Sequence, residues 1–349
     1  MTSLALWLRH LLHTRHIARL TSRHRHRVML CFCILPTLAR AGLRRDAAQN
    51  YTAEEINASA LRWNLKTTSS NSAAHKQAQE DCMQRDSSVV RANRDSKSYL
   101  ASGAWCLPEG KNTSSLVELP NGQTYVLPRV HAKADASIVP FLDRLLRGCS
   151  PEDAAGHQAK CKQPPRHSII DIGAGVGQYG HSLRAIDPAH DYRGYDGAGN
   201  IERVTSGFVR WTDLTSPRLA LPKADWVMSL EVGEHIDSKY ERHFVRNLHA
   251  HNCRGLVISW AVLGQWGRGH INNHGEAYIR KVFAELGYVY DVVATTTLRK
   301  HHVRTGHTTQ LAPAPGVSGP CWWFAKSLFV FRRATPQTGP GCGDRRLSI

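Results

Sequence analysis

The stretch SIIDIGAGVG, from Ser168 to Gly177, holds the residues with the clearest chemical potential. Its first half is apolar and β-rich. Its second half places glycine at 173, 175 and 177, so the stretch predicts a strand that runs into a flexible turn and then a helix. Glycines in such a turn let the backbone approach a ligand closely. The segment Gly175–Gly180 is also a formal GxGxxG, so a dinucleotide is a competing interpretation of the same turn.

Asp171 distinguishes between the two kinds of cofactor. It stands at the end of the predicted strand, beside the glycine turn, where a fixed negative charge would repel a pyrophosphate. The same charge favours a cofactor that carries an ammonium and a sulfonium group, which is S-adenosylmethionine.

Two later acids agree with this cofactor. Asp196 follows the next predicted strand, where an acid binds ribose hydroxyls in nucleotide folds, and Asp213 with Leu214 follows the third, where they can meet the adenine. The alternative role of either acid is to cap a loop or a turn.

A second group follows the fourth predicted strand, where Glu231, Glu234 and His235 stand at i, i+3 and i+4 and would share one face of a helix. His270, in a loop after the fifth strand, adds an imidazole at the same edge of the sheet. A hydroxyl acceptor must lose its proton to a base or to a metal ion. Three interpretations stay open. The four residues bind Mg²⁺ or Mn²⁺, His235 or His270 is a metal-free general base, or all have structural roles.

From Arg166 onward, short β-rich runs alternate with helical stretches, which predicts an α/β fold with a Rossmann-like, mostly parallel sheet of seven strands and helices on both faces. A helix over 276–286 is expected to end at Gly287. The predicted strands cover 167–172, 191–195, 208–211, 226–230, 256–260, 288–294 and 327–332.

Two elements are predicted upstream of this sheet. Residues 116–127 have the pattern of a hairpin with Asn121 and Gly122 at the turn. A helix then begins near Ile138, with Asp135 or Ser137 as its cap.

Residues 166–333 resemble a class I S-adenosylmethionine-dependent methyltransferase. The stretches DIGAGVGQYG, YDGAGNIE, DWVMSLEVGEHI, SWAVLGQWGRGHIN and KSLFVFRR are similar to the methyltransferase-like protein 24 family, as is VHAKADASIVPFLDRLL upstream. The resemblance implies an antiparallel last strand and a methyl-donor site over Asp171, Gly173, Gly175, Gly177, Asp196 and Asp213. The segment from Glu231 to His235 also resembles the ExxEH of metal-assisted O-methyltransferases that act on catechol-like or terminal ribose hydroxyls. The family resemblance does not imply the acceptor, whereas the ExxEH resemblance favours a hydroxyl group.

The first 45 residues have the composition of a targeting segment. A basic run precedes a short apolar core at 28–38, which ends at Ala39-Arg40-Ala41, and this order is typical of a secretory signal. A mitochondrial presequence and a signal-anchor are the alternatives. Glycosylation triplets at Asn50, Asn57 and Asn112 favour the secretory route and a glycoprotein.

The net charge of +17 would suggest nucleic acid as a partner. We do not expect one, because nine arginines in the first 45 residues supply more than half of the excess. No apolar stretch is long enough to predict a transmembrane helix.

The predicted divisions are a targeting segment (1–45), a flexible stem with one candidate helix (46–110), a hairpin and helix (111–165), a methyltransferase domain (166–333) and a loose tail (334–349).

The nine cysteines show no spacing typical of a metal site. In an oxidising compartment, Cys149 with Cys161 is the first expected disulfide and Cys82 with Cys106 the second.

The expected function is therefore O-methylation of a glycan or a small molecule by an S-adenosylmethionine-dependent enzyme, in the lumen of the secretory pathway or outside the cell. The alternatives are a mitochondrial small-molecule methyltransferase and a non-enzymatic lumenal scaffold with the same fold.

Overall fold

The structure is a computed structural model, and it describes residues 73–84, 106–107, 114–128, 131–156, 165–302, 317–318, 321–339 and 342. The predicted targeting segment, the asparagines of the three glycosylation triplets and Cys161 lie outside these ranges.

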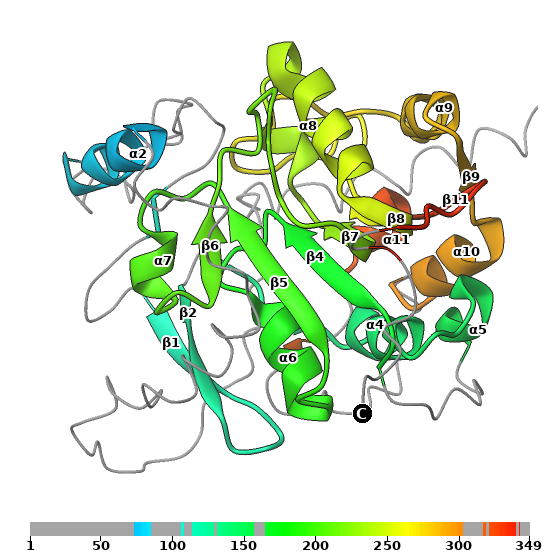
Figure 1. The fold of residues 1–349 in the computed structure, drawn as a ribbon, viewed down its shortest axis with the longest axis horizontal. Helices are drawn as coiled ribbons and strands as arrows, with labels where there is room; N and C mark the ends of the chain where they lie inside the picture. The colour runs from blue at the N-terminus through cyan, green and yellow to red at the C-terminus, as the bar shows by residue number, and fades with distance from the viewer. Residues whose placement is uncertain are drawn as a thin grey trace, which may run out of the picture. The chain divides into compact units, whose positions relative to one another are not determined.

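Seven strands form one sheet in the order β6-β5-β4-β7-β8-β11-β9 (Figure 1). The first five of these pair in parallel, whereas β11 runs antiparallel to both of its neighbours. This order with a reversed β11 is the Rossmann-like topology of the class I methyltransferase fold, so the predicted fold class is confirmed. The strands are β4 (Ser168–Ile172), β5 (Asp191–Asp196), β6 (Val209–Trp211), β7 (Ala224–Ser229), β8 (Asn252–Ser259), β9 (Tyr288–Tyr290) and β11 (Leu328–Arg333).

The central strands are buried along their whole length because helices cover both faces of the sheet. Every residue of β4 and β7 is buried, as expected for continuous apolar runs in a parallel sheet. Figure 1 shows α8 and α9 on one side of the sheet, and α4, α5, α6 and α10 on the other. These helices are α4 (Ile138–Leu146), α5 (Pro151–Ala155), α6 (Gln178–Ile186), α8 (Ser238–Ala250), α9 (Glu276–Glu285) and α10 (Val292–Lys300), and the short α7 (Ile201–Val204) and α11 (Phe324–Ser327) complete the set.

One predicted strand is shorter than expected. The run 288–294 forms a strand only as far as Tyr290, because the Asp291 side chain accepts a hydrogen bond from the Ala294 amide and caps α10. The β-branched residues at the start of α10 have a high strand propensity, so the sequence pattern extended the predicted strand into them. The helix cap outweighs this propensity.

Upstream of the sheet, the predicted hairpin is present as β1 (Ser114–Glu118) and β2 (Thr124–Pro128), with Gly122 at φ 80° in its turn. Two-residue strands, β3 (Ala134–Asp135) and β10 (Val317–Ser318), pair with each other in parallel. Asp135 caps α4, because its carboxylate accepts hydrogen bonds from the amides of Ser137 and Ile138.

Within the predicted stem, α2 (Ala73–Gln84) is the described helix, and the Cys82–Cys106 disulfide joins it to the segment 106–107. A second disulfide joins Cys253, on β8, to Cys342 in the predicted tail. Cys149 is also disulfide-bonded, and its expected partner is not among the described residues. The expected Cys82–Cys106 pair is therefore confirmed, and the Cys149–Cys161 pair stays a prediction.

In the part of the chain that the structure describes, no helix combines the length and the apolar character that crossing a bilayer requires.

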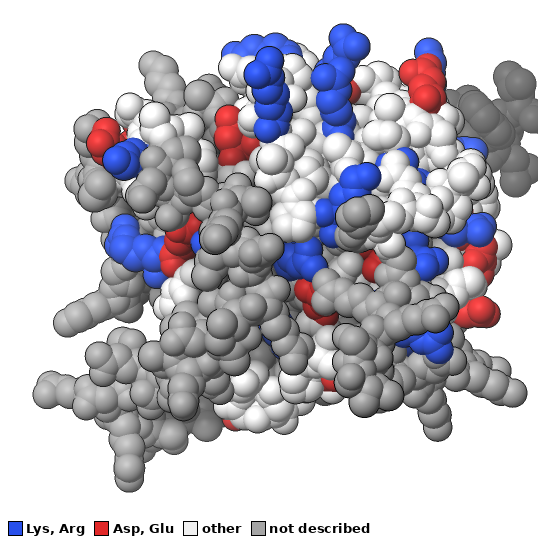
Figure 2. All heavy atoms as spheres, in the orientation of Figure 1, with Lys and Arg blue, Asp and Glu red and all other residues white. Residues whose placement is uncertain are grey.

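The outer side of α8 exposes Lys239, Arg242 and Arg246. Figure 2 shows basic side chains projecting in this region, with uncharged surface between them.

Candidate active site

The glycine turn after β4 has the backbone conformation that its sequence predicts. Gly173, Gly175 and Gly177 have φ values of 82°, 54° and 78°, in the left-handed region that favours glycine. The amides of Gly173 and Ala174 donate hydrogen bonds to the Tyr195 carbonyl over 2.8 and 3.0 Å, which attaches the turn to β5. Because α6 begins directly after Gly177, the turn joins the carboxyl end of a strand to the start of a helix.

Two of these glycines also allow close packing. A Cβ on Gly173 would overlap with Val232, which lies in the loop that carries the second candidate group. A Cβ on Gly175 would lie 2.7 Å from Cδ2 of His131. No local sequence pattern marks His131 as a neighbour of the glycine turn, because only the connection between the hairpin and α4 brings it there. Burial lowers the pKa of His131 to about 4, so a neutral imidazole lies against the turn.

Asp171 is buried near the end of β4 and is 3% exposed. It accepts a hydrogen bond from the Tyr192 hydroxyl over 2.7 Å. Burial raises the pKa of Asp171 to about 7, the Tyr192 hydrogen bond opposes this, and the charge of Asp196 adds to it. Among the described residues, no basic side chain forms an ion pair with Asp171. A cationic ligand here would therefore stabilise the ionised carboxylate.

Asp196 ends β5 and connects two parts of the same edge of the sheet. Its carboxylate accepts hydrogen bonds from the amide of Gly175 over 2.9 Å and from that of Ala198 over 2.8 Å. Burial raises the pKa of Asp196, and these amides oppose the shift. One carboxylate thus holds both the glycine turn and the turn after β5.

Asp213 and Leu214 follow β6 at the same edge, but their side chains are engaged locally. Asp213 accepts hydrogen bonds from the amide and the hydroxyl of Thr215, over 2.9 and 2.6 Å, so it also caps a turn. Leu214 is buried in the main hydrophobic core. Asp171, Asp196 and Asp213 lie at or just after the carboxyl ends of the adjacent strands β4, β5 and β6, and Asp196 is the one that contacts the glycine turn directly.

The segment from Glu231 to His235 is not one helix face. Glu231 has φ 58°, a left-handed conformation that is uncommon outside glycine, and only Gly233–His235 forms a short 3₁₀ helix. The Glu231 amide donates to the Ser259 hydroxyl over 2.6 Å, and that hydroxyl donates back to the Glu231 carboxylate over 2.8 Å. Gly233 is required because a Cβ there would overlap with the indole of Trp260.

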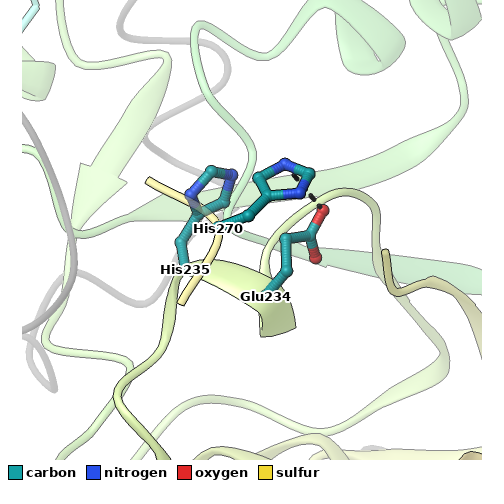
Figure 3. A group of neighbouring side chains, drawn as sticks. All are labelled: Glu234, His235 and His270. Carbon is teal, nitrogen blue, oxygen red and sulfur yellow. Dashed lines mark ion pairs between the residues drawn. The ribbon is translucent and has the colours of Figure 1, made fainter. Parts of the chain in front are cut away.

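Three of the four predicted residues come together. Glu234, His235 and His270 each place a ligand atom within 4.8 Å of the other two, and this group does not include Glu231. Figure 3 shows the Glu234 carboxylate and the His270 ring facing each other, with 4.0 Å between Oε1 and Nε2. Glu234 is fully buried, and neither of its carboxylate oxygens has a well-formed hydrogen bond from the described residues, although the amides of Glu234 and Ala261 and the Glu231 carboxyl act on its charge. A buried carboxylate without well-formed hydrogen bonds indicates a missing ligand or a bound proton.

The protonation states of this group follow from burial. Burial, followed by the charge of Glu231, raises the pKa of Glu234 well above its usual value. Burial raises the pKa of Glu231 to about 7. Burial, followed by the charge of His270, lowers the pKa of His235 to about 4, and burial also lowers the pKa of His270. Both imidazoles are therefore neutral at neutral pH, the form in which histidine binds a metal or accepts a proton.

Backbone carbonyls orient both rings. Nδ1 of His235 lies 3.1 Å from the Gly269 carbonyl, and Nδ1 of His270 lies 3.3 Å from the Gln265 carbonyl. Because a carbonyl only accepts, each neutral ring carries its proton on Nδ1 and its lone pair on Nε2.

A further acid, Glu241 on α8, supports the loop of His270 and was not predicted. Its carboxylate receives hydrogen bonds from Asn272 over 2.8 Å and from the Tyr278 hydroxyl, and it pairs with His274 over 2.7 Å. The amide of Asn272 donates to the Glu234 carbonyl over 3.0 Å. No local motif marks Glu241, because its partners lie more than thirty residues away along the chain.

No protein-family model and no curated protein sequence matches the chain. Solved structures of several methyltransferases are similar in fold. Magnesium protoporphyrin IX methyltransferase from Synechocystis, with bound S-adenosylmethionine, is 18% identical over 49% of this chain and 71% of its own, with a TM-score of 0.32. An O-methyltransferase family protein from Burkholderia thailandensis is 12% identical over 58% of each chain, with a TM-score of 0.36.

An amino pentose methyltransferase from Micromonospora echinaspora is 16% identical over 54% of this chain and 93% of its own, with a TM-score of 0.33. The fold of this chain is assigned from the order and direction of its strands. The activities named here belong to the similar proteins.

Proposed function

We propose that this chain is an S-adenosylmethionine-dependent methyltransferase that methylates a hydroxyl group. The observation that carries the proposal is the buried Asp171, which has no cationic partner among the described residues and stands beside three left-handed glycines at the carboxyl edge of the sheet. Binding a cation there offsets the cost of burying the charge. The sequence resemblance to the methyltransferase-like protein 24 family supports the same proposal.

The cofactor would lie along the carboxyl ends of β4, β5 and β6. In this placement, Asp171 faces its cationic methionine end, Asp196 accepts hydrogen bonds from the ribose hydroxyls, and Asp213 with Leu214 lies near the adenine. Transfer forms a bond between the acceptor oxygen and the methyl carbon and breaks the bond between that carbon and sulfur. The electron pair goes to sulfur, which becomes a neutral thioether.

The acceptor hydroxyl would lie at Glu234, His235 and His270. One carboxylate and two imidazoles fit a divalent transition-metal ion, and so does the lack of a well-formed hydrogen bond to the Glu234 carboxylate oxygens among the described residues. Two nitrogen ligands favour Mn²⁺ over Mg²⁺, which prefers oxygen. Such an ion, when bound, lowers the pKa of a coordinated hydroxyl. In the metal-free alternative, Nε2 of His235 or His270 accepts the proton directly.

The cofactor test is calorimetric titration with S-adenosylmethionine. The Asp196→Ala variant should bind more weakly by roughly 1 to 3 kcal/mol, because the ribose hydroxyls and the Gly175 amide lose their acceptor. Asp191→Ala, at the other end of β5, is the matched control and should bind normally. Equal affinity of the Asp196→Ala variant would remove Asp196 from the site, and no binding by the unaltered chain would favour the scaffold alternative.

The acceptor test is transfer of labelled methyl groups to a library of hydroxylated small molecules and glycans. His270→Ala should abolish transfer and leave cofactor affinity unchanged, because His270 is placed on the acceptor side. A chelator should stop transfer, and Mn²⁺ should restore it. Full activity in the chelator would reject the metal and leave the imidazole base.

We also propose a lumenal or extracellular location. Two described disulfides and the disulfide-bonded Cys149 favour an oxidising compartment over the mitochondrial matrix. The check is sensitivity to a glycosidase that removes N-linked glycans. We expect the glycosidase to lower the mass of the unaltered chain. Asn→Gln changes at positions 50, 57 and 112 should abolish this shift. Import of the chain into mitochondria would contradict the proposal.

A further inference from the structure

The turn after β5, residues 197–200, is buried throughout and determines where the Asp196 carboxylate points. The Ala198 amide donates a hydrogen bond to Asp196 over 2.8 Å, and the Ile201 amide donates to the Ala198 carbonyl over 3.0 Å. A shift of this turn would therefore move the acceptor that the ribose hydroxyls need. The groups that hold the turn come from far upstream in the sequence.

The backbone of α2 lies directly on this turn. A Cβ on Gly199 would overlap with the carbonyl of Ala78 and would lie 2.9 Å from Sγ of Cys82. The closest neighbour is backbone, which cannot retract as the end of a flexible side chain can. Only glycine at 199 allows this approach, so the turn and α2 are shaped to fit each other.

The segment Cys106–Leu107 holds the same turn from its other end. The Leu107 amide donates to the side-chain oxygen of Asn200 over 2.9 Å, and the Asn200 amide nitrogen donates to the Leu107 carbonyl over 2.8 Å. Asn200 and Leu107 are both buried, and a reciprocal pair of buried hydrogen bonds fixes position as well as distance.

An aromatic contact links α2 to the next strand. The Trp211 indole donates to the Gly197 carbonyl over 3.2 Å, and the ring of His75 stacks on Trp211 with 4.6 Å between the ring centroids. Trp211 ends β6, two residues before Asp213. The helix thus contacts the turn after β5 and the last residue of β6, which directly precedes the second turn proposed to face the adenosine.

We propose that α2 and Cys106–Leu107, joined by the Cys82–Cys106 disulfide, form a clip that positions the ribose-binding turn of the cofactor site. A helix of twelve residues is marginally stable by itself, so α2 depends on the disulfide and on its contacts with the turn. The cofactor site then includes residues almost 100 positions before the glycine turn. This inference rests on the proposed function, because it takes Asp196 as the ribose ligand.

The test compares two full-length variants, each of which lacks one disulfide. C82S/C106S opens the clip, whereas C253S/C342S removes the disulfide between β8 and the tail and leaves the clip intact. Calorimetric titration uses S-adenosylhomocysteine and, separately, adenosine. Suppose that, without the clip, residues 197–200 hold the ribose-binding conformation about one tenth of the time. Both dissociation constants then rise about tenfold in C82S/C106S. The C253S/C342S variant should bind both ligands as the unaltered chain does.

Thermal unfolding of the same proteins separates positioning from stability. A C82S/C106S variant that melts at a lower temperature but binds both ligands normally would overturn the inference, because the clip would then only stabilise the fold. If this variant does not fold, Asn200→Ala keeps the disulfide and removes both hydrogen bonds to Leu107. It should weaken binding of adenosine, and unchanged binding would overturn the inference. Failure of the unaltered chain to bind S-adenosylhomocysteine would overturn the proposed function itself.

Discussion

Buried carboxyl groups are the common feature of the candidate site. Burial raises the pKa of Asp171, Asp196, Glu231 and Glu234, so each resists ionisation in the folded chain without a ligand. A protein that only needed stability would place apolar residues at these positions. Their presence at one edge of a parallel sheet agrees with the proposed ligands, which bring positive charge: the sulfonium and ammonium of the cofactor at Asp171, and a metal ion at Glu234.

Asp171 gives a prediction with a definite sign. Its folded pKa of about 7 lies above its usual value of 3.8, so the unfolded chain loses this proton first as the pH rises. The free energy of unfolding should therefore fall between about pH 4 and 7 without cofactor, and Asp171→Asn should flatten this part of the curve. Urea unfolding at several pH values measures it. A curve of unchanged slope in the variant would contradict the raised pKa.

Binding of the cofactor should depend on pH in the opposite direction to the free energy of unfolding. A cationic cofactor selects ionised Asp171, so affinity for S-adenosylmethionine should increase from about pH 6 to pH 8 in the unaltered chain. Asp171→Asn is the control, because ionisation of the cofactor itself affects both proteins equally.

At the scale of elements, the sequence predicted every strand of the main sheet because short β-rich runs, bounded by turns, alternate with helical stretches. It grouped Glu234, His235 and His270, which the structure brings together, but it did not predict that Glu231 lies outside the group or which contacts bring Glu234 close to His270. These residues are brought together by the amides of Ile271 and Asn272, which donate to the Glu234 carbonyl, and by the packing of Trp260 on Gly233. Such contacts join segments of different strands and leave no local pattern.

The same limitation applies to α2. Its composition resembles a flexible stem, and its hydrophobic periodicity is weak. The helix is held by the Cys82–Cys106 disulfide, which the sequence predicts as its second expected pair, and by its close fit to Gly199, which no local pattern shows.

The glycine turn gives a prediction at this scale. Gly173 and Gly287 have nearly equal φ values, 82° and 83°, but a Cβ overlaps with Val232 only at Gly173 and meets nothing within 4 Å at Gly287. Both alanine variants incur the left-handed penalty of roughly 1 to 2 kcal/mol. Gly173→Ala should lose about 1 to 3 kcal/mol more through overpacking. It should also weaken binding of S-adenosylmethionine, which calorimetry measures. Equal stability of the two variants would contradict the close approach of Val232.

At the scale of the whole molecule, the two described disulfides attach upstream and downstream segments to the sheet. Cys82–Cys106 closes a separation of 24 residues beside β5 and β6, and Cys253–Cys342 closes one of 89 residues from β8 to the tail. Near the second disulfide, the Gln337 amide donates to the Cys253 carbonyl over 2.9 Å, and Lys223 donates to the Gln337 side chain over 2.9 Å. This part of the predicted loose tail is therefore bound to the domain.

Loop length predicts which disulfide contributes more to stability. A disulfide restricts the unfolded chain more when it closes a longer loop, so C253S/C342S should lower the free energy of unfolding by about 1 kcal/mol more than C82S/C106S, with each loss between about 2 and 5 kcal/mol. Guanidinium unfolding of the oxidised proteins measures both values. The reverse order would mean that C82S/C106S disturbs the native state as well as the unfolded one. If C253S/C342S is the less stable variant and still binds S-adenosylhomocysteine normally, lost stability cannot account for a weaker affinity in C82S/C106S, and the positioning of the ribose-binding turn remains as its cause.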